Sequence, residues 1–592
     1  MKFFAAVLFW FASATLALAA DGPDCRAVRM ADIGWTDVTA TTALTGVILE
    51  DLGYQPNISV LSVPVTYASM KNKDIDVFLG NWMPTMTSDR GPFVRDGSVE
   101  VIRANLTGAK YTLAVPAYLY DAGLKDFADI KRFGPALNHA IYGIEPGNDG
   151  NHQVLKLIKG DIDGLGGFKL IESSEQGMLA QVERSVRDKR PIVFLGWEPH
   201  PMNARFAMRY LTGGDSTFGP NYGGATIYTN TRAGYSRTCP NVGRLLRNLN
   251  FTLAQEDALM GAILDKHQDP HAAAGAWLAA HPEAAKVWLA GVTTYDGRPA
   301  ALNAATPSAR SDIDAWIIGH KIPIGAVMNN LVETVKAHGA GLFDAISTVI
   351  HGAVDGLTGL LKLAPPLLLI AAIGALAFGL QRSIPLTAFV VAALLLIMNQ
   401  GYWQAMLETL SLVLFSALTA TAIGVPLGIA AAHRPWLYKA MHPVLDLMQT
   451  LPTFVYLIPT LVLFGLGVVP GLISTVIFAL PAPVRLTHLG ISSTPKPLLE
   501  AGQAFGATPL QLLLKIELPS ALPTIVAGVT QCIMLSLSMV VIAALVGAGG
   551  LGVPVVRALN TVQVGMGFEA GFAIVLLAIV LDRMTKPRPA GR

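Results

Sequence analysis

Residues 405–431 read AMLETLSLVLFSALTATAIGVPLGIAA, and this stretch decides where a large part of the chain resides. It carries a single charged residue, Glu408, and is otherwise built mostly from apolar and small residues. An apolar run of about 20 residues is long enough for a helix to cross the roughly 30 Å hydrocarbon core of a bilayer. The stretch therefore predicts a membrane-spanning helix.

The same composition continues on both sides of this stretch. The charged residues between positions 363 and 480 are only Arg382, Glu408, Arg434, Lys439 and Asp446. We expect an all-α polytopic membrane domain over 363–592 with about seven spans, at 363–380, 384–400, 405–431, 448–467, 470–487, 521–546 and 565–582. With the N-terminal part outside, this count places nearly all Lys and Arg of the loops in the cytoplasm, as the positive-inside rule requires.

The whole-chain composition agrees with a chain that is partly in a membrane. Of 592 residues, 52% are hydrophobic and 14% are charged, against about 25% charged in a soluble globular protein. The formal net charge is +2, without the basic excess of a nucleic-acid binder. We therefore expect a water-soluble part followed by a membrane part, and no nucleic-acid partner.

The N-terminus has the pattern of a secretory signal. Residues 1–20 begin with Lys2, continue through an apolar stretch and end in Ala17-Leu18-Ala19, which a signal peptidase can cleave. An uncleaved N-terminal anchor is the alternative. In both cases residues 21–310 are predicted to lie on the extracytoplasmic, periplasmic side. In that oxidising compartment Cys25 and Cys239 are candidates for a disulfide, with two free buried thiols as the alternative.

Residues 21–310 have the rhythm of an α/β domain. Short apolar runs typical of buried strands alternate with helical patterns such as those at 41–52 and 151–158. The strand-like runs are at 58–61, 77–79, 113–115, 140–144 and 192–195. No Gly-x-x-x-x-Gly-Lys-Ser/Thr motif occurs in the chain, so no nucleotide is bound through that motif.

Aromatic residues stand at strand ends and loops of this domain. They are Trp35 in IGWTD (33–37), Trp82 in FLGNW (78–82), Tyr111 in KYTLAVP (110–116) and Trp197 in GWEPH (196–200). A quaternary ammonium group has no hydrogen-bonding capacity, so ring faces and dispersion must hold it. Three or four aromatic walls at roughly 0.5–2 kcal/mol each approach the roughly 8 kcal/mol of micromolar binding. An aromatic cage for such a cation is energetically sufficient, and ordinary core packing is the alternative for each ring alone.

These motifs, together with GIEPGNDG (143–150), resemble the choline and glycine betaine binding proteins of ABC importers. The resemblance implies a two-lobed periplasmic-binding-protein fold, type II-like, that closes on its ligand. It also implies an aromatic box of Trp35, Trp82, Tyr111 and Trp197, with Asp37 and Asn148 at the hydroxyl end of the ligand. Cys25 and Cys239 stand where choline-type members have a disulfide.

Choline and glycine betaine share the trimethylammonium head and differ in a hydroxyl or a carboxylate at the other end. A carboxylate beside Asp37 would be repelled in a partly desolvated cleft, whereas a hydroxyl can donate a hydrogen bond to it. We therefore expect choline, with glycine betaine or proline betaine as the alternative ligand. A helix N-cap is the alternative role of Asp37, and a turn residue is that of Asn148.

Residues 311–362 are amphipathic and too polar to span a membrane. We expect a linker here with helices that lie on the membrane surface, and a plain helical linker is the alternative. Beyond it, residues 363–592 resemble the permease subunits of glycine betaine and choline importers.

Segment 488–520 is similar to the coupling loop of ABC importer permeases. The matching positions are Glu500, Ala501, Gly506, Ile516, Leu518 and Pro519. Gly502 departs from the Glu-Ala-Ala pattern by one small residue for another. The resemblance implies that a separate cytoplasmic ATP-binding subunit docks here, helix in groove, and that two copies of the membrane half form the pathway.

The sequence therefore predicts a binding protein and a permease of an ATP-driven importer in one chain of the inner membrane. It offers no cofactor loop, metal motif or catalytic triad, so we expect no cofactor, no metal and no enzymatic activity. A membrane receptor that senses the ligand is the rival from another class. It would need a cytoplasmic signalling domain, and ten residues follow Asp582.

Overall fold

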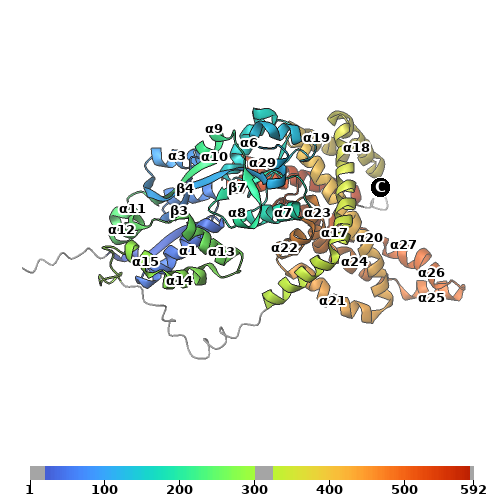
Figure 1. Ribbon diagram of the computed structural model, residues 1–592. Coiled ribbons are helices and arrows are strands. Elements are labelled where there is room, and N and C mark those ends of the chain that lie inside the picture. The colour runs from blue at the N-terminus through green and yellow to red at the C-terminus, as the bar shows by residue number, and fades with distance from the viewer. Residues whose placement is uncertain (1–20, 301–323, 587–592) are drawn as a thin grey trace, which may run out of the picture. The chain divides into compact units, whose positions relative to one another are not determined.

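The computed structural model describes residues 21–300 and 324–586 (Figure 1). The signal peptide predicted at 1–20 and the predicted linker residues 311–323 lie outside the described part. By contacts the chain divides into two compact units. The first comprises Met1–Tyr142, Gly147–Leu170 and Ser185–Ile322, and the second comprises Gly143–Pro146, Ile171–Arg184 and Pro323–Arg592.

The described strands form one mixed nine-stranded sheet. They are β1 (Ala27–Asp32), β2 (Gln55–Val60), β3 (Val77–Met83), β4 (Val99–Pro116), β5 (Ala140–Tyr142), β6 (Lys169–Ile171), β7 (Phe194–Glu198), β8 (Met208–Tyr210) and β9 (Gly224–Arg232). Their order is β2-β1-β3-β9-β4-β7-β5-β6, with β8 paired to β4. The strand-like runs of the sequence fall in or beside β2, β3, β4, β5 and β7.

The long strand β4 joins two groups of strands (Figure 1). The first strand group is β2, β1, β3 and β9, and the second is β7, β5 and β6. Its first part pairs with β9, from Val99 to Lys110, and its last part pairs with β7 from Lys110 onward. Lys110 is paired in register with both Gly224 of β9 and Glu198 of β7, so β4 changes its neighbouring strand at this residue. This is the two-lobed α/β architecture that the sequence predicts.

Helices flank both strand groups. They are α1 (Thr36–Asp51), α2 (Val63–Lys71), α3 (Thr87–Arg95), α4 (Ala117–Asp121), α5 (Phe127–Ile130), α6 (Asp149–Lys159), α7 (Glu175–Arg187), α8 (Met202–Arg205), α9 (Asp215–Phe218), α10 (Pro220–Gly223), α11 (Tyr235–Thr238), α12 (Pro240–Asn248), α13 (Leu253–Leu264), α14 (Pro270–Ala280) and α15 (Pro282–Trp288). Helix α1 is buried along most of its length because it packs between the strands and helices α13 and α14.

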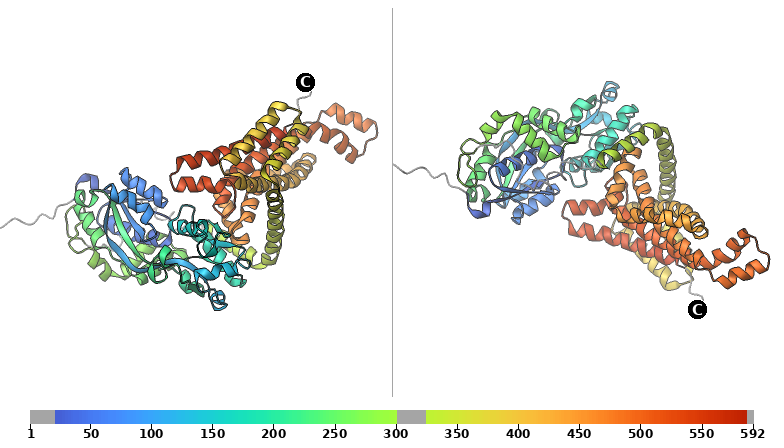
Figure 2. Two further views of the ribbon diagram at one scale, coloured as in Figure 1. Left: turned by 90° about the horizontal axis from the view of Figure 1, so that it is seen from above. Right: turned by 90° about the horizontal axis from the view of Figure 1, so that it is seen from below.

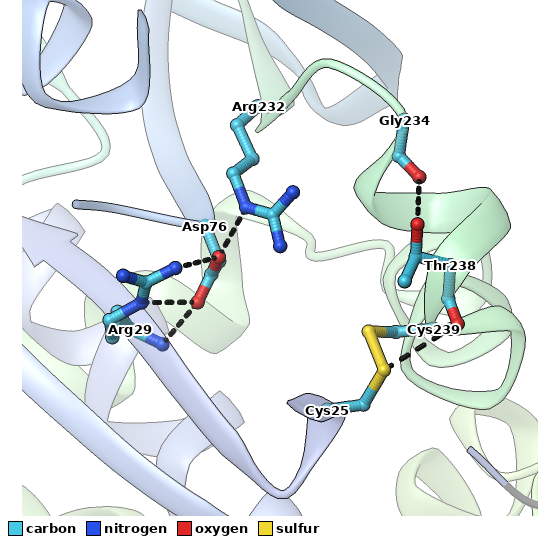
Figure 3. Close-up of polar contacts among 7 residues, drawn as sticks. All are labelled: Cys25, Arg29, Asp76, Arg232, Gly234, Thr238 and Cys239. Atoms are coloured by element: carbon cyan, nitrogen blue, oxygen red, sulfur yellow. Dashed lines mark hydrogen bonds and ion pairs between the residues drawn. A yellow bond between two sulfur atoms is a disulfide. The ribbon is translucent and has the colours of Figure 1, made fainter. Parts of the chain in front are cut away.

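The first strand group is held together at one end by Asp76, directly before β3 (Figure 3). Its carboxylate accepts hydrogen bonds from Arg29 Nε on β1 at 2.9 Å and from Arg232 Nε on β9 at 2.6 Å. Burial by itself raises the pKa of Asp76, but the bonds from both guanidinium groups outweigh it and the pKa is lowered. Strand β3, which carries Trp82, is thereby fixed between its neighbours.

Figure 3 also shows a disulfide between Cys25 and Cys239, with 5.6 Å between their Cα atoms. Cys25 lies two residues before β1, and Cys239 lies between α11 and α12, 214 residues further along the chain. The bond links the start of the described chain to the segment that follows the last strand. The third cysteine, Cys532, is buried and free.

From residue 324 on, the second unit is helical (Figure 2). Its helices are α17 (Ile324–Leu363), α18 (Pro366–Gln381), α19 (Ile384–Asn399), α20 (Trp403–His433), α21 (Pro435–Thr450), α22 (Thr453–Phe464), α23 (Val468–Ala479), α24 (Pro481–Ser492), α25 (Lys496–Ala504), α26 (Pro509–Leu512), α27 (Leu518–Ala544), α28 (Gly552–Asn560) and α29 (Val564–Thr585). A π-helical turn, Leu513–Glu517, leads into α27. Figure 2 shows these helices in yellow-green to red.

Helix α20 packs closely on α24 and α27 to form the centre of this unit. Gly424 and Gly428 of α20 face α24, and a Cβ at Gly428 would come within 2.6 Å of Thr487 Cβ. Small residues four apart let membrane helices approach each other closely. The apolar stretch 405–431 therefore lies in α20, the helix on which α24 and α27 pack.

The predicted number of seven spans is not confirmed. Among the described residues four helices are long and apolar enough to cross a membrane, or up to six if two bent helix pairs each count as one span. Helices occupy all seven predicted segments, but α18 and α19 have only 16 residues each. The predicted surface segment 311–362 contains one 40-residue helix, α17, from residue 324 on.

Candidate functional site

The six predicted ligand residues come from five different elements of the first unit. Trp35 and Asp37 lie at the start of α1, Trp82 on β3, Tyr111 on β4, Asn148 directly before α6, and Trp197 on β7. Each of the six is 5% exposed or less.

Tyr111 is the central ring of an aromatic group. Its ring centroid lies 5.9 Å from that of Trp82 and 6.0 Å from that of Trp197, both edge to face. Trp82 belongs to the first strand group and Trp197 to the second, while Tyr111 follows Lys110, where β4 changes partner. Three of the four predicted box residues therefore meet across the junction of the two groups, and Trp35 is placed at the N-cap of α1.

Phe218 is a fourth ring of this group that the sequence analysis missed. It lies at the end of α9, and its centroid is 6.1 Å from that of Tyr111. Phe218 precedes Gly219 in the sequence, and Gly219 has a φ of +121°. The surrounding sequence, GGDSTFGPNYGG (213–224), is typical of a loop. A loop setting is the signal that pointed to the four predicted rings, so the sequence carried the information.

Asp37 is held against Trp82. The indole Nε1 of Trp82 donates a hydrogen bond of 2.9 Å to Asp37 Oδ2. Asp37 lies inside the first turn of α1, where the helix dipole favours an anion, and the N-cap position is occupied by Trp35 rather than Asp37.

Gly80 explains how α1 comes so close to β3. A Cβ at Gly80 would lie 2.3 Å from Cγ2 of Val38, the residue after Asp37. Only a residue without a side chain therefore allows α1 to lie on β3 at this distance. The close approach brings the first turn of α1 to Trp82, two residues further along the strand.

Asn148 has a structural role at the start of α6. It is the N-cap of α6, since its Oδ1 accepts a hydrogen bond from the backbone N–H of Asn151 at 3.0 Å. The same oxygen accepts from the Tyr111 hydroxyl at 2.9 Å, and its Nδ2 donates to Asp149 Oδ1 at 3.1 Å. A Cβ at Gly150 would lie 2.0 Å from the Tyr111 hydroxyl oxygen, so a glycine is needed at this position.

Buried carboxyl groups surround this site. Burial raises the pKa of Asp149 to about 7, and nearby Asp89 adds to the effect. Burial also raises the pKa of Glu256, and the charges of Asp37 and Asp257 act in the same direction. Burial and the neighbouring acidic residues thus favour the neutral form of Glu256.

The predicted coupling residues lie in the second unit. Glu500 and Ala501 are exposed on the short helix α25, and Gly506 follows this helix with a φ of +78°. Ile516 lies in the π-helical turn, and its Cδ1 is 2.4 Å from where a Cβ of Gly502 would be. Leu518 and Pro519 begin α27. The structure thus places α25 against the segment that leads into α27.

Phe505 is a further residue of this segment that the sequence analysis did not single out. It directly follows α25 and is 92% exposed. A phenylalanine in solvent at the end of a short exposed helix is an accessible apolar contact for another protein. No sequence signal distinguishes such an exposed phenylalanine from a buried one.

The described residues contain no group of three or more His, Cys, Asp or Glu side chains that could hold a metal ion. A buried aromatic group with the Asp37 carboxyl group against one ring, at the junction of two strand groups, is suited to binding a small cation. The fold and this site define a solute-binding module, carried on the same chain as a helical membrane region.

Comparisons with known proteins cover both parts of the chain. The family of substrate-binding domains of ABC-type glycine betaine transport systems matches residues 26–280. The family of inner membrane components of binding-protein-dependent transport systems matches residues 424–586.

Individual relatives agree with these matches. The glycine betaine transport system permease protein OpuAB of Bacillus subtilis is 45% identical over 267 residues, which are 45% of this chain and 94% of that protein. The glycine betaine/carnitine transport permease protein GbuB of Listeria monocytogenes is 46% identical over 268 residues, 45% of this chain and 95% of that protein. A solved ABC-transporter choline binding protein in complex with choline is 57% identical, and the match covers 47% of this chain and 96% of that one with a TM-score of 0.47.

The chain belongs to the family of binding-protein-dependent ABC import systems of the glycine betaine type, and it carries the substrate-binding domain and the permease component in one polypeptide. Members of this family are transport components and not enzymes. The permease component is a protein of the inner membrane. The prediction of a fused binding protein and permease is confirmed.

Proposed function

We propose that this importer component prefers choline and that Trp35, Asp37, Trp82, Tyr111, Asn148 and Trp197 line its ligand site. The single observation that carries the choline preference is the hydrogen bond from Trp82 Nε1 to Asp37 Oδ2. It holds the Asp37 carboxyl group against one wall of the aromatic group.

Charge separates the two ligands at this site. Choline is a cation and carries a hydroxyl, whereas glycine betaine has the same cationic head and a carboxylate. Beside a buried carboxylate the second negative charge is repelled in a medium of low dielectric constant. The neighbouring side chains Asp149 and Glu256 are acidic groups with raised pKa values, and neither can supply a positive charge to offset this repulsion.

Hydrogen bonding supports the same preference. A ligand hydroxyl can donate to Asp37 and accept from Asn148. The hydrogen bonds recorded for Asn148 among the described residues use its Oδ1 twice and one of the two N–H groups of Nδ2. A carboxylate can only accept, and so it cannot satisfy an anionic partner.

Calorimetric titration of the full chain in a neutral detergent tests this proposal. We expect choline to bind at least about tenfold tighter than glycine betaine, because one unfavourable charge contact is worth more than about 1.4 kcal/mol. Asp37→Asn should weaken choline binding and remove most of the difference between the ligands. Asp51→Asn, the same change at the other end of α1, is the matched control and should alter neither affinity.

Two results would overturn the choline assignment. Equal or tighter binding of glycine betaine, with Asp37→Asn harmless, would instead favour a glycine betaine or proline betaine importer for osmoprotection. Failure of both compounds to bind the wild-type chain would argue against the aromatic site itself.

The same proposal extends to the organisation of transport. The binding domain faces the periplasm and delivers its ligand to a pathway formed by two copies of the permease half. A separate cytoplasmic ATP-binding subunit docks on the coupling segment 488–520, at Glu500, Ala501, Gly506, Ile516, Leu518 and Pro519. The exposure of Glu500 and Phe505 supports this docking site, and the mass of the purified chain in detergent tests the dimer.

A further inference from the structure

An apolar groove of about 440 Å³ runs between α18 and α19 of the membrane region. Phe378 of α18 forms one side, and Ile384, Thr387, Val391 and Leu395 follow one another along α19. The hydroxyl of Thr387, the polar side chain among these, donates to the Ser383 backbone oxygen at 3.0 Å. The groove therefore offers a hydrocarbon surface without an unsatisfied polar group.

Gly374 sets the spacing of the two helices. A Cβ at this position would come 2.9 Å from Val391 Cγ2, so the helices touch here without a side chain between them. Phe378, one turn further along α18, is 46% exposed, and Ile384 is 74% exposed. The two helices thus touch at Gly374 and Val391, and the exposed Phe378 and Ile384 line the groove near the turn that joins them.

The length of the groove matches one leaflet of a bilayer. From Ile384 to Leu395 the helix rises about 16 Å at 1.5 Å per residue, which is about half of the roughly 30 Å hydrocarbon core. A single acyl chain that enters from one membrane surface has this reach.

A group of positive charges lies near this turn. Arg382 stands in the turn between α18 and α19, and no ion pair is recorded for it within 21–300 and 324–586. Next to it, Gln381 Nε2 donates to the backbone oxygens of Met584 and Lys586, at 3.2 and 2.8 Å, so the turn sits on the end of α29. This brings Arg382 to the segment that contains Arg583 and Lys586.

One carboxylate reduces this positive charge without cancelling it. Asp582 pairs with Lys586 Nζ at 2.8 Å and lies 4.0 Å from Arg583 Nε. Arg382, Arg583 and Lys586 thus carry three positive charges against the one negative charge of Asp582, in the turn and the helix end that Gln381 joins. Basic pockets between membrane helices are suited to anionic lipid head groups.

We propose that this groove and its cationic end form a binding site for an anionic phospholipid, with one acyl chain along α19 and the phosphate at Arg382. An apolar protein segment in the groove would leave Arg382 without a counter-charge. A zwitterionic lipid would bring its own cation to the cluster. The observations therefore favour a lipid with net negative charge.

The test uses the full chain in a neutral detergent with phosphatidylglycerol and phosphatidylethanolamine of identical acyl chains. Native mass spectrometry of the equimolar mixture should show at least about five times more bound phosphatidylglycerol than phosphatidylethanolamine. This is the ratio expected when about one cation near the membrane surface favours the anionic head group. Phosphatidylglycerol with a photoreactive acyl chain should label peptides within residues 378–395. Label spread evenly over the membrane helices would overturn the proposal.

Variants separate the two parts of the site. Arg382→Gln should reduce the preference about fivefold, Arg382→Lys should retain it, and Arg434→Gln, at an exposed arginine in another turn, should leave it unchanged. Ala388→Phe fills the groove and should lower labelling with all cations in place, which keeps the test decisive if Arg382→Gln does not fold. Equal effects of Arg382→Gln and Arg434→Gln, or displacement of the lipid by excess glycerol phosphate, would contradict a site made of groove and cations together.

Discussion

The two functional regions of this chain differ most in burial. The six proposed ligand residues are 5% exposed or less, whereas α25 of the coupling segment has no buried residue and Phe505 after it is 92% exposed. A quaternary ammonium group has no hydrogen-bonding capacity and is best held by rings that exclude water. A partner subunit, in contrast, can bind only side chains that it can reach. Substitutions should therefore affect folding and function together in the first region and function alone in the second.

The largest effect is expected for Trp82→Ala. Loss of a buried tryptophan costs about 3–5 kcal/mol of stability, and it also removes a ring and the donor to Asp37. We expect a lower unfolding temperature and choline affinity weakened at least about 30-fold, measured by fluorescence-detected melting and calorimetry.

Trp277→Ala is the matched control for this prediction. Trp277 is buried on α14 and stacks on His281, outside the proposed site. It should lose stability with little change in affinity. Unchanged choline binding by Trp82→Ala would contradict the prediction that this buried ring also binds the ligand.

A second effect concerns pH. The pKa of Asp149 is raised from 3.8 to about 7 by burial, so between about pH 4 and 7 the folded state holds a proton that the unfolded state releases. The stability from this proton is fully present below pH 4 and is lost as the pH rises through 7, by at most about 4 kcal/mol at 1.36 kcal/mol per pH unit.

Asp149→Asn tests this contribution because it keeps an oxygen that can accept from Asn148 and cannot ionise. The unfolding temperature of the binding domain in the full chain should fall less between pH 5 and pH 8 in this variant than in wild type. Parallel curves for the two proteins would show that Asp149 is already ionised at pH 5.

The coupling segment should behave in the opposite way. Phe505→Ser should leave the unfolding temperature nearly unchanged, because exposed substitutions are usually within ±0.5 kcal/mol. Choline uptake into vesicles that contain the ATP-binding subunit should fall about tenfold, with choline affinity intact. Gln503→Ala on the same exposed helix is the control. A marked loss of stability in Phe505→Ser would mean that this ring is buried.

The smallest effect is expected for Gly502→Ala. The added methyl group would come 2.4 Å from Ile516 Cδ1 and 2.7 Å from Leu512 Cδ2, which are the far ends of flexible side chains. The better helix propensity of alanine, about 1 kcal/mol, offsets the cost of moving them. Uptake should stay within about twofold of wild type, while Gly502→Val, which cannot be accommodated so easily, should reduce it further.

The sequence predicted much of the binding half because its signals are local. Strand-like runs, rings at strand ends and loops, and motif order pointed to the two-lobed fold and to three rings that the structure brings into contact. Phe218 has the same local signal and could have been found. The raised pKa of Asp149 and the contact of Gly80 with Val38 could not, since both arise from segments that meet only in the folded chain.

The membrane half shows where hydropathy is insufficient. It located every apolar segment but not the number of spans, because the helix pairs around Pro365 and Pro452 bend by 106° and 95°. Hydropathy is the same for a helix that crosses a bilayer and for one that turns back. The exposure of Phe505 likewise follows from what packs nearby, which composition does not report.

The shared strand β4 has a consequence for how the ligand leaves. The chain passes between the strand groups at Lys110 and again at Gly224, which are paired with each other. If the two groups separate by a hinge, we expect its axis at this pair, with Tyr111 as the next residue. Trp82 and Trp197 would then move apart while Tyr111 stays near the axis. Such an open form would present only half of the aromatic cage and would hold a cation less tightly than the closed form.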